Sequence, residues 1–186
     1  MDALSRSAGY LAMAGGALAT ILVGVVALDP NTGAWSGFFL VVALLGAVVV
    51  GLEKRTRALT GLLGRASAWL SAIGASALLA VFVYAVATNQ MKFDATATSD
   101  PLLPLWAVTA IAWFLGDIGF GIAIVRAKAL SASGGWLVLA GAVAGVGMSL
   151  YPSAPPVPIT LLFGLFGIGW FVVGYAATRA PARLTA

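Results

Sequence analysis

The sequence predicts an all-α protein, a polytopic bundle of six membrane-spanning helices in one domain that covers residues 1–186. Two observations predict this fold class. Hydrophobic residues make up 61% of the chain and charged residues only 9%, whereas about 25% of the residues in a soluble domain are charged. The few basic residues stand in short clusters at the ends of apolar runs, as in membrane proteins, and not on a face that would bind nucleic acid.

A helix that crosses the apolar core of a bilayer needs about 20 mostly apolar residues. Six runs have this character, namely residues 8–28, 35–52, 66–88, 103–125, 132–151 and 157–178. The connections between them are short, so we expect one compact bundle and no soluble domain. The first run is longer than the apolar part of a signal peptide and no small-residue cleavage site follows it, so we interpret it as the first span.

The basic residues also predict the orientation of the bundle, because cytoplasmic loops carry an excess of Lys and Arg. With a cytoplasmic N-terminus, Lys92 is the one basic residue on the outer side. The inner side then holds Arg6, Lys54, Arg55, Arg57, Arg65, Arg126, Lys128, Arg179 and Arg183. Aromatic residues mark the same boundaries, with Tyr10, Trp69, Trp136 and Tyr175 at the inner interface and Trp35, Trp106 and Tyr151 at the outer one. We therefore expect a multi-pass protein of the cell inner (plasma) membrane with both termini in the cytoplasm.

The spans further suggest three parallel helical hairpins. Each odd-numbered span has an aromatic residue and a leucine before a glycine, and each even-numbered span has two glycines before a basic residue. The first set is Tyr10 with Gly15, Trp69 with Gly74 and Trp136 with Gly141; the second is Gly46 with Gly51, Gly116 with Gly121 and Gly169 with Gly174. A triplicated hairpin explains the pattern. Every membrane hairpin, however, needs interfacial aromatics, small residues and a basic stop, so both explanations stay open.

Small residues spaced by four predict close packing between helices, because lipid tails provide no hydrophobic drive for helices to associate in a bilayer. Gly16, Thr20 and Gly24 form such a face on the first span, and Gly141 and Gly145 form another on the fifth. These faces would serve contacts within the chain, with a membrane-protein partner or in a homo-oligomer.

Asp117 is the one ionisable residue deep within a span. Its separation from Arg126 along a helix places it about 13 Å into an apolar core about 30 Å thick. A carboxyl at this depth costs a few kcal/mol, so we expect it to face the interior of the bundle and not the lipid. Helical spacing puts Trp113 and Gly121 on the same face, and these three residues form the candidate intramembrane polar site.

No basic residue lies in a span to pair with Asp117, so we expect its carboxyl to hold a proton. The functional interpretation makes it a proton-relay or cation site, or an anchor for a polar ligand group. The structural interpretation makes it one end of a hydrogen bond to a neighbouring helix. The hydroxyls that could form this bond are those of Thr20, Ser71, Ser76, Ser149 and Thr160.

The composition excludes most kinds of metal site and catalytic site. The chain has no cysteine and no histidine, which removes disulfides and the usual ligands of zinc, haem and iron–sulfur clusters. No pair of nucleophile and base can be found in the spans, so we expect no catalytic residue, no metal, no cofactor and no enzymatic activity. A retinal pigment is excluded because no span contains the lysine of its Schiff base.

Two further groups allow two interpretations each. Trp113, Phe166 and Trp170 could line an aromatic cavity for an apolar or quaternary-amine ligand, or pack the helices together. The basic residues of the cytoplasmic connection 53–65 could hold anionic lipid headgroups, or set the orientation only.

The segment GFGIAIVRAKAL, from Gly119 to Leu130, is followed by Gly134-Gly135-Trp136-Leu137. It resembles a segment that recurs in uncharacterised integral membrane proteins of actinobacteria, in which a helix ends in Arg-Ala and a short turn leads to Gly-Trp and the next span. Ser131-Ala132-Ser133 stands here in place of the usual proline. The resemblance covers the fourth and fifth spans and implies a bacterial inner membrane, without an activity.

Two hypotheses of function follow. The first is a non-catalytic membrane protein, an accessory or scaffold component of a larger assembly. The alternative is a small proton- or cation-coupled transporter, or a ligand-binding membrane protein, centred on Asp117.

Overall fold

The computed structural model describes residues 3–29, 34–88, 102–150 and 157–179, and every regular element in these ranges is an α-helix. The helices are α1 (Ala3–Leu28), α2 (Ala34–Ala87), α3 (Leu103–Ala127), α4 (Ala132–Ser149) and α5 (Val157–Arg179). All five are long and apolar enough to cross a membrane. The predicted all-α fold is confirmed for the described residues. Six separate helices are not, because the runs predicted at 35–52 and 66–88 both belong to α2.

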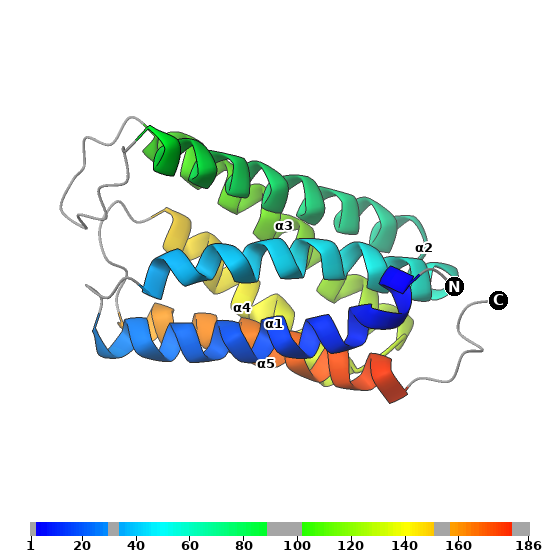
Figure 1. Ribbon diagram of the computed structural model, residues 1–186. Coiled ribbons are helices and arrows are strands. Elements are labelled where there is room, and N and C mark those ends of the chain that lie inside the picture. The colour runs from blue at the N-terminus through cyan, green and yellow to red at the C-terminus, as the bar shows by residue number, and fades with distance from the viewer. Residues whose placement is uncertain (1–2, 30–33, 89–101, 151–156, 180–186) are drawn as a thin grey trace.

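Residues 53–65 of α2, where we expected a connection between two spans, are helical except for one kink. The kink is at Gly61, with φ 59° and ψ −149°, a conformation that is essentially restricted to glycine. At this point α2 reverses its direction, so that a first arm (residues 34–60) and a second arm (residues 62–87) run side by side in opposite senses (Figure 1). The segment stays helical because Leu, Glu, Lys, Arg and Ala favour helix and no proline interrupts it.

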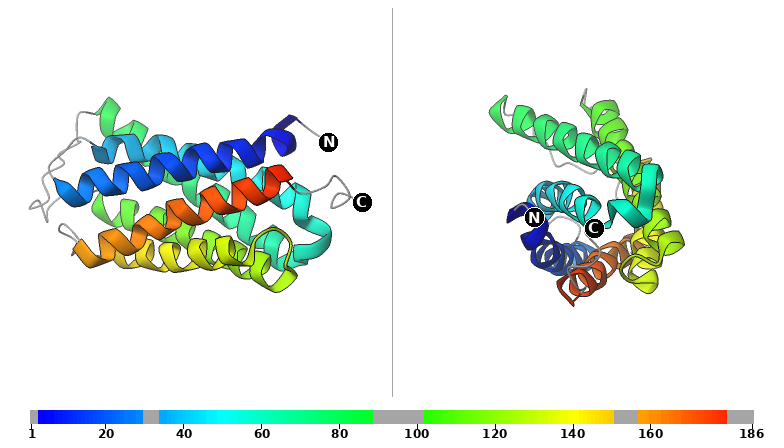
Figure 2. Two further views of the ribbon diagram at one scale, coloured as in Figure 1. Left: turned by 90° about the horizontal axis from the view of Figure 1, so that it is seen from below. Right: turned by 90° about the vertical axis from the view of Figure 1, so that its right-hand side faces the viewer.

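The helices form a closed ring. α1 packs on α2 and on α5, α3 packs on α2 and on α4, and α4 packs on α5. The right-hand view of Figure 2, which looks along the bundle, shows this order around its axis, with the second arm of α2 at the margin beside α3. The interior is filled by large side chains, of which Trp113, Phe120, Phe166 and Trp170 are fully buried.

Glycines bring α1 and α5 into backbone contact. A Cβ atom at Gly16 would lie 2.5 Å from the carbonyl oxygen of Gly167, and one at Gly174 would lie 2.6 Å from that of Gly9. Thr20, one turn after Gly16, also faces Gly167. The predicted packing face is therefore confirmed at Gly16 and Thr20. Gly24 makes no such contact within the chain, since a Cβ there would meet nothing within 4 Å.

The second predicted small-residue face, on α4, contacts two different helices. Gly141 lies against the backbone of Phe166 on α5. Gly145 lies against the ring of Phe114 on α3, where a Cβ would approach to 2.6 Å. Both glycines thus serve contacts within the chain.

The hairpin pattern has equivalent contacts in two places. Gly74 lies against Trp113 and Gly141 lies against Phe166, at matching positions of the second and third hairpins. The glycines of the even-numbered spans make matching contacts as well. Gly116 on α3 lies against Ser71 on α2, and Gly169 on α5 lies against Val138 on α4.

The first hairpin differs from the other two. Gly15 contacts Leu45, and Gly46 faces Ala75 of the next hairpin instead of α1. Its first helix and the first arm of α2 are therefore packed in another register.

Charge is strongly asymmetric along the bundle. The start of α1, the bend at Gly61, the turn between α3 and α4 and the end of α5 all lie at one end (Figure 1), which we call the basic end. The described Lys and Arg residues all lie there, namely Arg6, Lys54, Arg55, Arg57, Arg65, Arg126, Lys128 and Arg179. Lys92, predicted for the outer side, and Arg183, predicted for the inner side, lie outside the described part of the chain.

The aromatic residues predicted for the inner interface have exposed side chains near the basic end. Tyr10, Trp69, Trp136 and Tyr175 are between 42% and 68% exposed, as expected for rings that stand among lipid headgroups. At the other end, Trp106 packs against Phe39 with ring centroids 5.3 Å apart. The side chain of Trp35 and the whole of Tyr151 fall outside the described residues.

Candidate functional site

Asp117 lies in the middle of α3 with no exposed surface. Its Oδ1 atom accepts a hydrogen bond of 2.7 Å from the Ser71 hydroxyl, on the second arm of α2. Ser71 is also fully buried. The structural interpretation of Asp117, a hydrogen bond to a neighbouring helix, is thus realised with one of the five hydroxyls predicted for it.

The other four candidate hydroxyls are engaged or placed elsewhere. Thr20 donates to the Gly16 carbonyl and Ser149 to the Gly145 carbonyl, each within its own helix. Ser76 is on the exposed face of α2. Thr160 is buried on α5 and lines a cavity of about 10 Å³ with Phe38 and Phe163, room for about one water molecule.

Two glycines bring Ser71 within reach of Asp117. A Cβ atom at Gly116 would lie 2.5 Å from the Cα of Ser71, and one at Gly74 would lie 2.7 Å from the Cα of Trp113. The backbones of the second arm and of α3 therefore touch one turn apart, on both helices. Any larger residue at either glycine would separate the helices and lengthen the bond to Asp117.

Three buried polar atoms have no hydrogen-bond partner among the described residues. They are Asp117 Oδ2, Trp113 Nε1 and Trp170 Nε1. An unpartnered polar atom in an apolar interior carries its full desolvation penalty, about 1–3 kcal/mol. The interior around Asp117 is therefore polar at a few points and incompletely satisfied.

Trp113 closes one side of Asp117. Its ring stacks on the Phe114 ring, with centroids 4.6 Å apart. It also makes a tilted contact with Phe38 and a T-shaped contact with Phe166, with centroids 5.9 and 5.5 Å apart. Phe166 also makes a T-shaped contact with Trp170 at 6.3 Å. Trp113, Phe166 and Trp170 thus pack against one another and fill the space in which an aromatic ligand cavity was one possibility.

Gly121, the third member of the predicted site, packs against α4. A Cβ atom there would lie 3.0 Å from the Gly135 carbonyl oxygen on α4. The helix surface beside Gly121 is therefore covered by α4. The structure brings Asp117 together with Trp113 and Ser71, and it assigns Gly121 to a helix contact.

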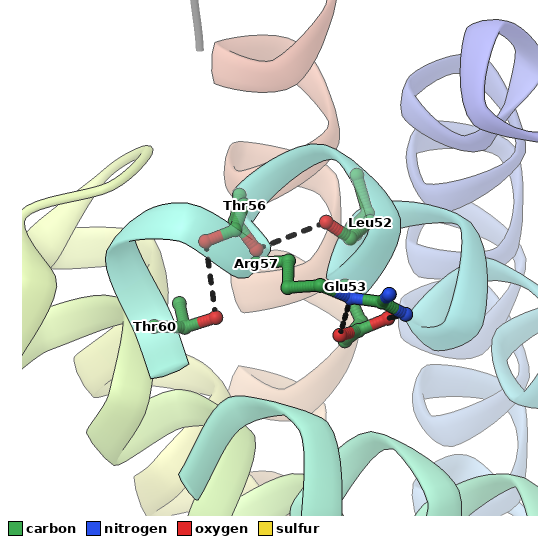
Figure 3. Close-up of polar contacts among 5 residues, drawn as sticks. All are labelled: Leu52, Glu53, Thr56, Arg57 and Thr60. Carbon is green, nitrogen blue, oxygen red and sulfur yellow. Dashed lines mark hydrogen bonds and ion pairs between the residues drawn. The ribbon is translucent and has the colours of Figure 1, made fainter. Parts of the chain in front are cut away.

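A second polar cluster lies at the bend of α2 (Figure 3). The Glu53 side chain is 3% exposed and accepts two hydrogen bonds from the Arg57 guanidinium, 2.8 Å from Nε and 3.0 Å from Nη2. Thr56 donates to the Leu52 carbonyl and Thr60 to the Thr56 carbonyl. Sequence reasoning missed the buried Glu53, although its spacing of four from Arg57 on a helix is a signal for this pair.

Two buried hydroxyls of the second arm of α2, those of Ser67 and Ser71, lie at helical spacing along α3 beside Asp117. We call these two residues the hydroxyl line. Thr60 is buried on the first arm, before the bend, where its hydroxyl donates to the Thr56 carbonyl. The described side chains contain no group of three or more His, Cys, Asp or Glu that could hold a metal ion.

The chain matches no family model, no curated protein and no solved structure. Its function is therefore argued from its own residues.

Proposed function

We propose that this chain is a non-catalytic multi-pass protein of a bacterial inner membrane that acts as an accessory or scaffold component of a membrane assembly. The observation that carries the proposal is the packing around Asp117. The Ser71 hydroxyl occupies one oxygen of the carboxyl, and fully buried Trp113, Phe166 and Trp170 fill the neighbouring interior. A side chain held in this way stabilises a bundle and leaves no room for a substrate.

The proposal includes six crossings with both termini in the cytoplasm. The two arms of α2 run in opposite senses (Figure 1), so each arm can cross the bilayer separately. The basic end then faces the cytoplasm, in agreement with the rule that cytoplasmic segments are rich in Lys and Arg. The equivalent glycine contacts of the second and third hairpins support a repeated hairpin unit for these two.

The interior contacts leave the outer surface of the helices as the place where other proteins bind. Large apolar side chains such as Ile73 and Leu161 are 63% and 57% exposed. Such side chains face lipid or another membrane protein, because both environments are apolar. An accessory role therefore needs no change in the bundle itself.

Co-purification tests the accessory role. A tagged copy expressed at its natural level would be cross-linked in membranes, extracted in mild detergent and sized by native electrophoresis. We expect a particle larger than the chain or its dimer, containing one other membrane protein in fixed proportion, and the same particle with Asp117→Asn. Recovery of the chain by itself after cross-linking would contradict the proposal.

A second candidate function rests on the unpartnered Oδ2 atom of Asp117 and on the hydroxyls that lead to it. These groups favour a small proton- or cation-coupled transporter. Proteoliposomes with an internal pH-sensitive dye and an imposed Na⁺ or K⁺ gradient test this candidate. Proton movement that follows the gradient and is lost with Asp117→Asn would support transport, and equal movement in both proteins would rule it out.

A further inference from the structure

Asp117 has different surroundings on its two sides along the bundle axis. The side away from the basic end is closed by Trp113, which precedes Asp117 by one turn of α3 and is fully buried among aromatic rings. Gly74 also holds the second arm of α2 against the backbone of Trp113. Neither water nor a hydroxyl can approach the carboxyl from this side without displacing these rings.

The side toward the basic end carries hydroxyls. Ser71 contacts Asp117 directly, and Ser67 lies one turn nearer to the bend. Ser67 packs on Gly119 of α3, where a Cβ atom would lie 3.1 Å from the Ser67 Cβ. Because residues spaced by four on a helix have Cβ atoms about 5–6 Å apart, one water molecule can bridge the two serine hydroxyls.

The hydroxyl line is less deeply buried toward the bend of α2. Ser67 is 7% exposed, whereas Ser71 and Asp117 have no exposed surface. Arg65 and Ala66, which precede Ser67 on the side of the bend, are exposed. Water at the basic end therefore reaches the line at Ser67.

We propose that Asp117 is a proton-binding site that exchanges its proton with water at the basic end only, along the hydroxyl line Ser71 and Ser67. Oδ2 has no partner among the described residues, and the bound proton belongs on this oxygen. The proposal is independent of the accessory role, because a scaffold and a transporter could both contain such a site.

Exchange moves no net charge. The carboxyl group first rotates so that its O–H bond points to Ser71 Oγ. This O–H bond breaks as its proton binds to Ser71 Oγ, and the Ser71 O–H bond breaks as the former hydroxyl proton passes along the line to water. A proton from water then returns through the same hydroxyls in the reverse order and restores the O–H bond of Asp117.

Few other titratable groups can take part. α3 packs on α2 and α4 and meets α5 through aromatic rings. α4 contains no titratable side chain, and those of α5, Tyr175 and Arg179, stand in its last part. Those of α2 stand near the bend or at the far end of its second arm, namely Glu53, Lys54, Arg55, Arg57, Arg65 and Tyr84. The described residues thus place no second proton acceptor beside Asp117.

Infrared spectroscopy of the protein in lipid bilayers tests the proposal. A protonated carboxyl has a carbonyl stretching band that shifts when its proton is replaced by deuterium. We expect this band in the wild-type protein and not in Asp117→Asn. After a change to D₂O, we expect the shift to be severalfold slower in Ser67→Ala, which leaves the bond between Ser71 and Asp117 in place.

Thr109→Val is the matched control. Thr109 is buried on the same face of α3 as Asp117 but beyond Trp113, and it donates to the Leu105 carbonyl of its own helix. We expect wild-type exchange in this variant, with melting temperatures confirming that both variants fold. The proposal is overturned by absence of the band in the wild type, by an unchanged rate in Ser67→Ala, or by slower exchange in Thr109→Val than in Ser67→Ala.

Discussion

Single residues decide how a carboxyl is accommodated in the apolar interior. Asp117 carries one strong contact, the 2.7 Å bond from Ser71, and one oxygen without a partner among the described residues. A neutral carboxyl is compatible with this environment, whereas an ionised one would need a cation or several donors. The same interior leaves two tryptophan N–H groups unpartnered. The described core is therefore held mainly by packing of aromatic rings, and the bond between Ser71 and Asp117 joins two of its helices.

The bond between Ser71 and Asp117 gives the first prediction. Ser71→Ala leaves both carboxyl oxygens without a partner, so we expect a loss of about 1 kcal/mol of stability, within the range of hydrogen bonds in membrane proteins. Asp117→Asn keeps an acceptor for the Ser71 hydroxyl and should lower stability less. Thermal unfolding in detergent, followed by tryptophan fluorescence, measures both.

Ser149→Ala is the control for this comparison, because the Ser149 hydroxyl bonds only to the Gly145 carbonyl of its own helix. We expect a melting temperature close to that of the wild type. A variant Asp117→Asn that is less stable than Ser71→Ala would contradict this account of the bond.

Elements associate through glycines that allow backbones to touch. α1 and α5 cross at Gly9 with Gly174 and at Gly16 with Gly167, and such close contacts are the main source of helix association in lipid. The bend of α2 depends on glycine for another reason, since Gly61 adopts a positive φ. Contact and conformation are separate requirements, and each can be tested by adding one methyl group.

Gly16→Ala is expected to destabilise the bundle by about 1–3 kcal/mol, the usual range for overpacking, because its Cβ would overlap the backbone of α5. Gly24→Ala, on the same helix, should be neutral or stabilising, since its Cβ meets nothing within 4 Å and alanine favours helix. Melting temperatures of the two variants measure the difference. Equal effects of the two substitutions would refute the contact between α1 and α5.

Gly61→Ala is expected to lower stability by about 1–3 kcal/mol, the cost of a side chain in a glycine-only conformation. Space is not the reason, because a Cβ atom at Gly61 would meet nothing within 4 Å. Gly147→Ala is the matched control, since Gly147 is equally open but has no positive φ. A wild-type melting temperature for Gly61→Ala would show that the bend does not need glycine.

The whole molecule is a ring of helices with an aromatic interior and one basic end. The bend of α2 and the C-terminal end of its second arm are at opposite ends of the bundle (Figure 1). If the chain crosses the membrane six times, these points face different compartments. A single long crossing of α2 would instead place its bend in the apolar core.

Cysteine labelling distinguishes these arrangements, because the natural chain has no cysteine. Ala58 is exposed near the bend of α2, and Thr88 is exposed directly after the C-terminal end of α2. In intact cells, a membrane-impermeant maleimide should label Thr88→Cys and not Ala58→Cys, and after permeabilisation it should label both. Labelling of Ala58→Cys in intact cells would reverse the orientation, and its protection after permeabilisation would place the bend in lipid.

Much of the fold could be predicted from the sequence, because apolar length and charge position are local properties. The runs at 103–125 and 132–151 correspond closely to α3 and α4. The reversal near 53–65 was predicted, but its helical backbone was not, since charged residues that usually mark a loop also favour helix. The candidate site was predicted in part. Asp117 and Trp113 face the interior, whereas Gly121 faces α4.

The sequence by itself determined that this is a helical membrane protein, that its basic residues gather at one end, and that Asp117 must be shielded from lipid. Each of these follows from the solvation of individual residues, for which the identity of the neighbours is not needed. Only the tertiary structure decided which hydroxyl bonds to Asp117 and where α2 bends. It also decided why a side chain at Gly16 would overlap α5 whereas one at Gly24 would meet nothing. These depend on the rotation and distance of helices far apart in sequence, and on the backbone angles of Gly61.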